Sequence, residues 1–452
     1  MIQRISSILP NSQKFQILIL FIMTLILAAL EILSLGSIPI LIGSILSGDV
    51  AFINSVGLNN FISNLDIRII CFFVIIIFVI KNSFVMFFNY FTFNLNYKIN
   101  TSLSKQIFQD YLYSDYLTIS KIKTSDMIRN LTTEVNGFVS CINNFIQVFK
   151  DIVILSSILI LIITVLDKKF FFIFLVFLIL TSAFYLMIKN FLKRIGKETV
   201  LLRSKYIETI TDSFQLIKEI IINSKKDFFI NKYYKNLKLT EKNNLKSSFV
   251  FTSGRAIFEI IAVIMMVSLV LYLNNKDYEI TFIISYLSLI GISVIRSVPL
   301  FNSILTSLNK LQYKKPSIIV ISNLIDFTKK NKKFQASYVD YNKKENFKIN
   351  FNKNIRIDNL TFKYDKNIVL DNLNLKIKKG EKIVLLGSSG SGKTTLMNIL
   401  SGLIELDEKK LYVDDIEVEH NNYNNYRKII SFMPQESYLM NETIHNNIVF
   451  DD

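Results

Sequence analysis

Six long apolar stretches precede residue 305, and they limit the possible folds of this chain more than any other feature. Each holds about 20 mostly apolar residues, the length that a helix needs to cross a bilayer. The first is longer than the roughly 7–15 apolar residues of a signal peptide and ends without a cleavage site. The stretches are residues 15–46, 68–93, 145–166, 170–192, 250–273 and 280–304. The sequence therefore predicts a six-helix transmembrane domain over residues 1–312.

The connections between these stretches have unequal lengths. Stretches three and four are joined only by Asp167, Lys168 and Lys169, and stretches five and six by a short polar turn. About 50 residues separate stretch two from three, and four from five, with no proline and almost no glycine. In the second of these connections, apolar residues from Ile207 to Ile221 recur at helical spacing. These connections are predicted to be long helices that leave the bilayer, turn and return.

Charge predicts the orientation of the spans. The loop from Leu41 to Ile67 contains no lysine or arginine, whereas residues 96–144 and 193–248 contain many. By the positive-inside rule, the long connections and both chain ends are expected on the cytoplasmic side. The formal net charge of +16 could also indicate nucleic-acid binding. No recognition module accompanies that charge, so we expect no nucleic-acid partner.

The composition changes after Leu311. Residues 313–354 are expected to form a linker, because the region from 326 onward is rich in lysine and asparagine and lacks periodicity. Short strands are predicted at 355–360 and 373–377, and another at Lys382–Leu386.

A glycine-rich loop follows the last predicted strand and matches the pattern G-x-x-x-x-G-K-[ST]. Glycines allow successive backbone N–H groups to point at phosphate oxygens, and the helix that follows directs its N-terminus at the same anion. Lys393 is placed to reach the β- and γ-phosphates, and the Thr394 hydroxyl to reach Mg²⁺. A glycine turn without a ligand is the alternative, and the flanking strand and amphipathic helix argue against it. The expected nucleotide-binding residues are Gly387, Ser388, Gly390, Ser391, Gly392, Lys393, Thr394 and Thr395.

With its flanking residues, this soluble part resembles the nucleotide-binding domain of ABC transporters. Tyr364 falls where that family places an aromatic ring that stacks on adenine, although a tyrosine that merely packs is the alternative. Met433-Pro434-Gln435 resembles the Q-loop, whose glutamine contacts Mg²⁺ and the attacking water. Arg427, Asn441–Ile444 and Asn447-Ile448 also follow the family pattern. The resemblance implies ATP and Mg²⁺ as cofactors.

Six spans followed by one such domain resemble an exporter-type half-transporter. The resemblance implies a second half-transporter as partner, in a homodimer, and a multi-pass location in the inner (cytoplasmic) membrane. In this family the signature loop, the Walker B aspartate with the catalytic glutamate and the switch histidine follow the Q-loop. None has a counterpart before Asp452, and His420 and His445 are interpreted as surface residues. Residues 355–452 are therefore expected to be the N-terminal part of an α/β P-loop domain, incomplete, folding poorly alone and not competent for hydrolysis.

Parts of the membrane half resemble flippases for lipid-linked oligosaccharides. The resembling segments are Glu31 with Gly36–Pro39, residues 125–135, and Arg296–Pro299. The resemblance places Lys81, Arg255 and Arg296 along a substrate cavity. Cations within spans are costly and usually face a partner or an aqueous cavity, and a pyrophosphate-linked lipid would be such a partner. Alternatively, Glu31 could neutralise Lys81, and Arg255 could snorkel or pair with Glu259.

Three functions remain open from the sequence. The first is ATP-driven export or flipping of a lipid-linked saccharide or other amphiphile. The second is a peptide or bacteriocin exporter, which an N-terminal cysteine-peptidase domain would favour and these 452 residues do not contain. The third is a non-catalytic membrane protein that binds nucleotide without turnover.

Overall fold

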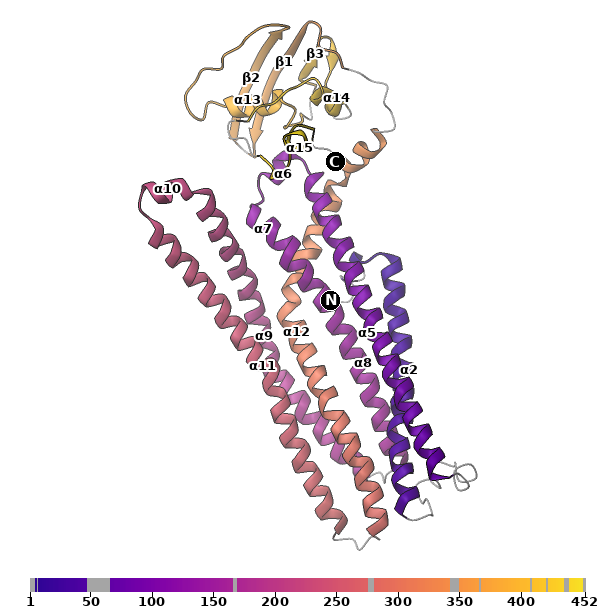
Figure 1. Ribbon diagram of the computed structural model, residues 1–452. Coiled ribbons are helices and arrows are strands. Elements are labelled where there is room, and N and C mark those ends of the chain that lie inside the picture. Colours follow the sequence, from indigo (N-terminus) through magenta and orange to yellow (C-terminus); the bar gives the residue numbers. More distant parts are fainter. Residues whose placement is uncertain are drawn as a thin grey trace. The chain divides into compact units, whose positions relative to one another are not determined.

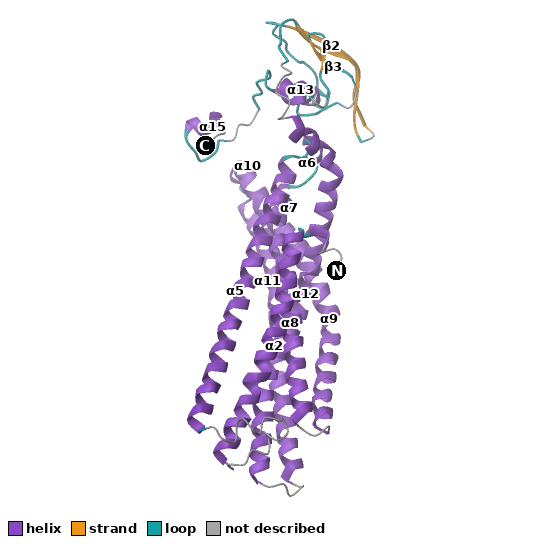
Figure 2. Cartoon of the chain, turned by 90° about the vertical axis from the view of Figure 1, so that its right-hand side faces the viewer, coloured by secondary structure: helices purple, strands orange, loops and turns teal. Residues whose placement is uncertain are grey.

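The chain forms two compact units in the computed structural model. Unit 1 comprises Met1–Gln109 and Lys123–Asp326, and unit 2 comprises Asp110–Ile122 and Phe327–Asp452. Within the described residues, unit 1 is helical and the strands lie in unit 2 (Figure 1, Figure 2). The described residues are 5, 7–46, 66–165, 169–274, 280–341, 349–365, 367–406, 409–419, 422–434 and 439–449.

Long helices and a few short helical segments make up the described part of unit 1, and two of the long helices continue into residues of unit 2. They are α2 (Asn11–Leu46), α5 (Ile67–Leu112), α7 (Thr124–Arg129), the π-helical turn η1 (Asn130–Glu134), α8 (Val135–Val165), α9 (Lys169–Gln215), α10 (Ile217–Ile222), α11 (Lys226–Asn274) and α12 (Ile280–Tyr341). The long helices predicted between spans four and five are confirmed: α9 and α11 pack side by side, and α10 lies at their tip (Figure 1).

Four stretches of the described residues are long and apolar enough to cross a membrane. They are Asn11–Ile42, Ile67–Leu112, Thr124–Thr164 and Gly291–Asp326, which overlap predicted spans one, two, three and six. The spans predicted at 170–192 and 250–273 lie within α9 and α11, where most side chains are outside the described set. The count of six spans therefore stays a prediction.

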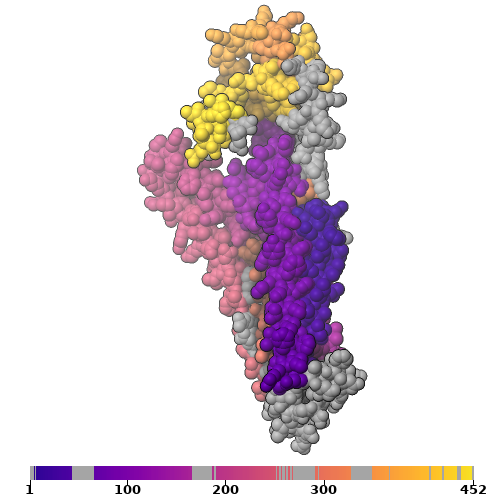
Figure 3. All heavy atoms as spheres, turned by 45° about the vertical axis from the view of Figure 1, so that its right-hand side comes forward, coloured from indigo at the N-terminus to yellow at the C-terminus, as the bar shows by residue number. Residues whose placement is uncertain are grey.

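Close helix approaches organise unit 1. α2 packs against α8, and α5 (purple) runs along the same face as α2 (indigo) in Figure 3. A methyl group at Gly137 of α8 would overlap the Ser317 side chain of α12. At Gly196 of α9 it would overlap the Tyr313 carbonyl group of α12. Only glycine fits at these two crossings, because any Cβ would overlap the neighbouring helix.

An antiparallel sheet with strand order β2-β1-β3-β4 forms the centre of unit 2. The strands predicted at 355–360 and 373–377 are confirmed, because they lie within β1 and β2 and pair Ile355 with Ile377. The elements are α6 (Tyr116–Ile119), β1 (Asn354–Tyr364), β2 (Asn367–Lys378), α13 (Lys393–Leu400), β3 (Leu411–Val413), β4 (Ile416–Glu417), α14 (Tyr423–Arg427) and α15 (Ile444–Val449).

The core of unit 2 lies between the sheet and helices α13 and α14. Ile357 of β1, Ile399 of α13 and Tyr426 of α14 are almost fully buried in one cluster. Leu117 of α6 packs against the same cluster, and Lys121 forms an exposed ion pair with Asp365 at 2.9 Å. The segment that joins α5 to α7 is therefore part of unit 2.

Two segments differ from the sequence predictions. Residues 313–341, expected to begin the linker, are helical in α12. Ile318, Ile321 and Ile325 are buried at helical spacing, and this apolar stripe stabilises the continued helix. The strand expected at Lys382–Leu386 is absent from the sheet, and its Leu386 is 88% exposed. A strand is stabilised by a hydrogen-bonded neighbour, and the sheet of the described residues offers none beside this segment.

Candidate functional site

The glycine-rich loop reaches its shape through left-handed backbone at two positions. Gly390 has φ +84° and Gly392 has φ +85°, a region that side chains with a Cβ rarely adopt. An added Cβ at Gly387 would lie 2.7 Å from the Ser391 hydroxyl oxygen, so a larger residue there would require the Ser391 side chain to move. The loop thereby turns sharply into α13, whose first residue is Lys393.

The Lys393 ammonium lies inside this loop. Its Nζ donates to the carbonyl oxygens of Gly387 and Ser388, both at 2.7 Å, and to the Ser391 hydroxyl at 3.3 Å. The side chains of Lys393 and the loop are not deeply buried. The first N–H groups of α13 have no acceptor within the helix, and the helix dipole adds positive charge at the same end. Together with the ammonium, these groups make the loop suited to a phosphate anion.

Packing at both ends holds α13 in place. At its start, a Cβ on Gly392 would lie 2.9 Å from Leu370 of β2, so the loop lies directly against the sheet. At its end, Arg427 donates from Nε to the Gly402 carbonyl at 2.8 Å and pairs with Glu405 at 2.6 Å. Sequence reasoning placed Arg427 only in a family pattern, and the structure shows that it fastens the turn after α13.

The remaining predicted nucleotide residues have varied surroundings. Thr394 is exposed and Thr395 is buried. The half-buried Tyr364 ring packs edge-on against Phe362, with centroids 5.1 Å apart. This is the packing that the alternative interpretation of Tyr364 expects, and adenine stacking stays a prediction. Gln435 lies outside the described residues, as does His420; His445 is exposed.

A cluster of charged side chains lies among the apolar helices of unit 1. Glu31 of α2 pairs through Oε2 with Lys81 Nζ of α5 at 2.6 Å. The same carboxylate approaches Arg296 Nε of α12 through Oε1 at 3.5 Å. Lys81 Nζ also donates to the Ser34 hydroxyl at 3.1 Å. The structure therefore unites two of the three predicted cavity cations, whereas the Arg255 side chain is outside the described set.

Sequence reasoning proposed that Glu31 could neutralise Lys81, and the 2.6 Å ion pair confirms that alternative. It did not identify Ser34. The available signal was its spacing, because Ser34 lies three residues after Glu31 and so on the same face of α2.

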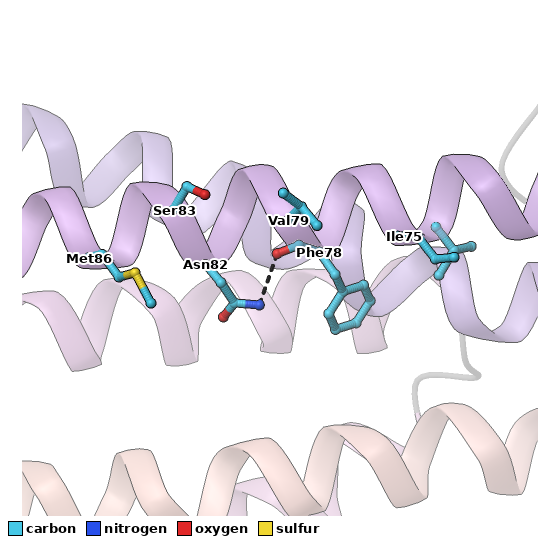
Figure 4. Close-up of a pocket in the computed structure, with 7 residues that line it drawn as sticks. Ile75, Phe78, Val79, Asn82, Ser83 and Met86 are labelled. Atoms are coloured by element: carbon cyan, nitrogen blue, oxygen red, sulfur yellow. Dashed lines mark hydrogen bonds between the residues drawn. The ribbon is translucent and has the colours of Figure 1, made fainter.

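An apolar hollow lies on α5 near this cluster. It has a volume of about 450 Å³, and Figure 4 shows Phe78, Asn82 and Met86 projecting into it from one face of the helix. The Asn82 amide donates to the Phe78 carbonyl at 2.9 Å, so part of its polarity is satisfied within the helix. The Phe78 ring links the hollow to the cluster, because Lys81 Nζ lies 5.6 Å from its centroid.

Comparison with known proteins identifies the class of the soluble part. The family described as ABC transporter matches residues 370–451, which include the glycine-rich loop and α13. Over 74 residues the chain is 38% identical to an ATP-dependent lipid A-core flippase of Methylobacillus flagellatus, covering 16% of this chain and 13% of that protein. Over 72 residues it is 36% identical to a colicin V secretion/processing ATP-binding protein of Escherichia coli, covering 16% and 10%.

A third similarity extends over the membrane region. The chain is 24% identical over 391 residues to a putative export ATP-binding/permease protein of Rickettsia bellii, covering 80% of this chain and 62% of that protein. The chain thus spans less than two thirds of each of these relatives. Residues 370–451 thus form an ABC transporter domain, and the chain is similar to exporter-type proteins in which a membrane region is joined to an ATP-binding domain.

Proposed function

We propose that the chain is the half-transporter part of an ATP-driven exporter that moves an anionic amphiphile, such as a lipid-linked saccharide, outward across the inner membrane. The observation that carries the nucleotide part is the position of Lys393, with its ammonium held by two loop carbonyls at the start of α13. A phosphate oxygen would take the place of those neutral carbonyl acceptors, and its negative charge would strengthen the hydrogen bonds from the ammonium.

The loop residues would divide the work of nucleotide binding. The amides that follow Gly392 would bind phosphate oxygens, and Lys393 would neutralise their charge. The exposed Thr394 hydroxyl and Gln435 would hold Mg²⁺, which when bound neutralises charge between the phosphates. Tyr364 would stack on the adenine. Within residues 355–452 we assign nucleotide binding and no catalytic carboxylate, so turnover requires groups beyond those named here.

The proposed partner is a second copy of the chain. Large apolar side chains are exposed around α10, among them Phe214 at 73% and Ile222 at 80%. Such a patch on a segment expected in the cytoplasm marks an interaction surface. The α5–α7 connection lies in unit 2, so a rearrangement there on ATP binding would act directly on two spans.

The membrane cluster supports an anionic amphiphile as substrate. Two cations meet one carboxylate within the spans, so the described cluster carries an excess positive charge that an acidic head group would balance. The adjacent hollow on α5 is mostly apolar and would receive a hydrocarbon chain. This pairing of charge and apolar surface favours a lipid over the peptide named for the colicin exporter.

Photolabelling tests the nucleotide assignment. The full chain in lipid nanodiscs is expected to be labelled by an azido-ATP analogue with Mg²⁺, and Lys393→Ala is expected to reduce the affinity about tenfold or more, since hydrogen bonds to charged groups contribute about 1.5–3 kcal/mol. Lys382→Ala removes an exposed lysine just before the loop and is the matched control. Equal labelling of Lys393→Ala and wild type, with both proteins folded, would overturn the proposal.

A further inference from the structure

We infer that the two cations of the membrane cluster have separate roles: Arg296 contacts the acidic head of the substrate, and Lys81 is a positioning residue that neutralises Glu31. This inference rests on the proposed anionic amphiphile and specifies how it is recognised. It departs from the sequence expectation that Lys81 and Arg296 act alike along a cavity.

Lys81 is already fully engaged. An ammonium has three donors, and those of Lys81 meet the Glu31 carboxylate at 2.6 Å and the Ser34 hydroxyl at 3.1 Å, while the Phe78 ring faces the same nitrogen at 5.6 Å. The residue is only 2% exposed. A ligand could reach this nitrogen only by breaking a buried ion pair, which would leave Glu31 as an uncompensated charge.

Arg296 has the opposite character. Its Nε lies 3.5 Å from Glu31, well beyond the 2.7–2.9 Å of a charge-assisted hydrogen bond, and its side chain is 44% exposed. A guanidinium has five donors in a planar fork that matches the oxygens of a phosphate. Arg296 therefore keeps both the charge and the donors that a phosphate head requires.

Glu31 connects the two roles. Its Oε2 is held by Lys81 and its Oε1 lies beside Arg296. While Lys81 is present, the carboxylate is neutralised and Arg296 stays attractive to an anion. Without Lys81, the uncompensated carboxylate of Glu31 would neutralise Arg296 and repel the anionic head group. A variant that lacks the Lys81 ammonium still contains Arg296, so a loss of binding in that variant would arise indirectly.

The ligand class is an amphiphile with a phosphate head. The head would lie at Arg296, and the chain would lie in the hollow on α5 that contains Phe78. One carboxylate against two cations leaves a single positive charge in the described cluster. A zwitterionic head would gain less from this field than an anionic one.

Two single variants and one double variant test the division of roles. The full chain in a neutral maltoside detergent is titrated with fluorescent phosphatidic acid, and with fluorescent phosphatidylcholine for comparison. Lys81→Met and Arg296→Gln are each expected to weaken phosphatidic acid binding about tenfold, the equivalent of about 1.4 kcal/mol. The double variant Glu31→Gln with Lys81→Met is expected to bind within about threefold of wild type, because it removes both members of the pair and leaves Arg296.

Two controls keep the outcome interpretable. Arg194→Gln removes one positive charge from an 82% exposed arginine outside the cluster and is expected to bind like wild type. Inorganic pyrophosphate as a competitor separates recognition of the head from recognition of the whole lipid. If Lys81→Met does not fold, the double variant alone shows whether Lys81 contacts the head group. In that variant neutral residues of similar size replace both charged residues.

Three other outcomes would contradict the assigned roles. A double variant as weak as Lys81→Met would show that Lys81 itself contacts the head, and unchanged binding by Arg296→Gln would remove Arg296 from that role. Equal binding of both lipids by wild type would overturn the anionic substrate along with this inference. ATP-analogue labelling is measured on the same proteins, so that a failure of the nucleotide proposal is seen separately.

Discussion

At the scale of single residues, three of the four left-handed glycines of unit 2 differ in what surrounds them. Gly390 and Gly380 have φ near +80°, and a Cβ on either would meet nothing within 4 Å. Gly392 has φ +85°, and its Cβ would lie 2.9 Å from Leu370 and 3.0 Å from the Val369 carbonyl. Conformational strain is therefore common to the three, whereas a steric clash arises only at Gly392.

Alanine substitution separates strain from clash. We expect Gly390→Ala and Gly380→Ala each to lower the free energy of unfolding by about 1–2 kcal/mol, the cost of a left-handed non-glycine residue. Gly392→Ala should cost more, because the start of α13 must also move away from β2. Only the two loop variants should weaken binding of the ATP analogue, and Gly392→Ala the more strongly.

Thermal unfolding of the full chain and titration with the analogue measure the two effects. Gly380→Ala is the control for backbone strain outside the loop. Equal losses of nucleotide binding at Gly380 and Gly392 would contradict the assignment of the loop to phosphate binding.

At the scale of elements, the β3–β4 hairpin is fastened to the start of β1 by one carboxylate. Asp414 accepts hydrogen bonds from the backbone N–H groups of Asn352 at 2.9 Å, Lys353 at 2.6 Å and Asn354 at 2.8 Å. Loss of solvent raises the pKa of Asp414, but these three bonds and the charge of Lys353 outweigh that effect, so its pKa is lowered from the usual value. Asp414 itself has a left-handed backbone with φ +56°. Its carboxylate is thus the hydrogen-bond acceptor for three backbone amides.

The lowered pKa of Asp414 predicts how the stability of the fold changes with pH. A carboxyl group whose pKa is lower in the folded than in the unfolded state stabilises the fold above the unfolded pKa of about 3.9, and this stability is lost as the pH falls through the folded pKa. The unfolding temperature of wild type should therefore decrease below about pH 4 more steeply than that of Asp414→Asn. Asparagine also tolerates a left-handed backbone, so the substitution keeps the turn while it removes the charge and one of the two acceptor oxygens.

Asp415→Asn serves as the matched control, because it removes the neighbouring exposed carboxylate. Thermal unfolding between pH 3 and 7, followed by circular dichroism, gives the comparison. If Asp414→Asn and wild type lose stability in parallel on acidification, the hairpin does not depend on this charge.

At the scale of the whole molecule, the pair α9 and α11 ends in a tip whose apolar side chains lack cover. Phe214, Ile222 and Phe228 are 60–80% exposed there. Burial of such a side chain contributes about 1.5–3 kcal/mol, so several together can hold a partner. A second copy of the chain is the partner that the proposed exporter requires.

We expect the double variant Phe214→Asp with Ile222→Asp to raise the dimer dissociation constant at least about tenfold, since each side chain would lose its apolar burial. Mass photometry of the full chain in nanodiscs over a dilution series measures the dimer fraction. Lys225→Ala changes the same tip without removing an apolar side chain and should leave the dimer unchanged. Undiminished dimerisation of the double variant would place the contact elsewhere.

Much of the fold could be predicted from local patterns in the sequence. Long apolar runs predict α2, α5 and α8 because a helix in lipid satisfies its backbone hydrogen bonds within its own segment. The glycine pattern before Lys393 predicts the loop, since left-handed turns are a property of glycine alone. The strand at Lys382–Leu386 was predicted on the same local grounds and is wrong for this structure, because a strand depends on a neighbour that its own residues do not specify.

By itself the sequence determined where helices could cross a membrane and where a phosphate could be bound, because both follow from residues close together in the chain. Only the tertiary structure decided that Glu31 takes Lys81 as its tight partner and leaves Arg296 exposed, since residues 31, 81 and 296 meet through three different helices. It likewise decided that α12 continues to Tyr341 and that Asp414 holds β1. In each case the decisive energy comes from contacts between distant residues, which no local pattern encodes.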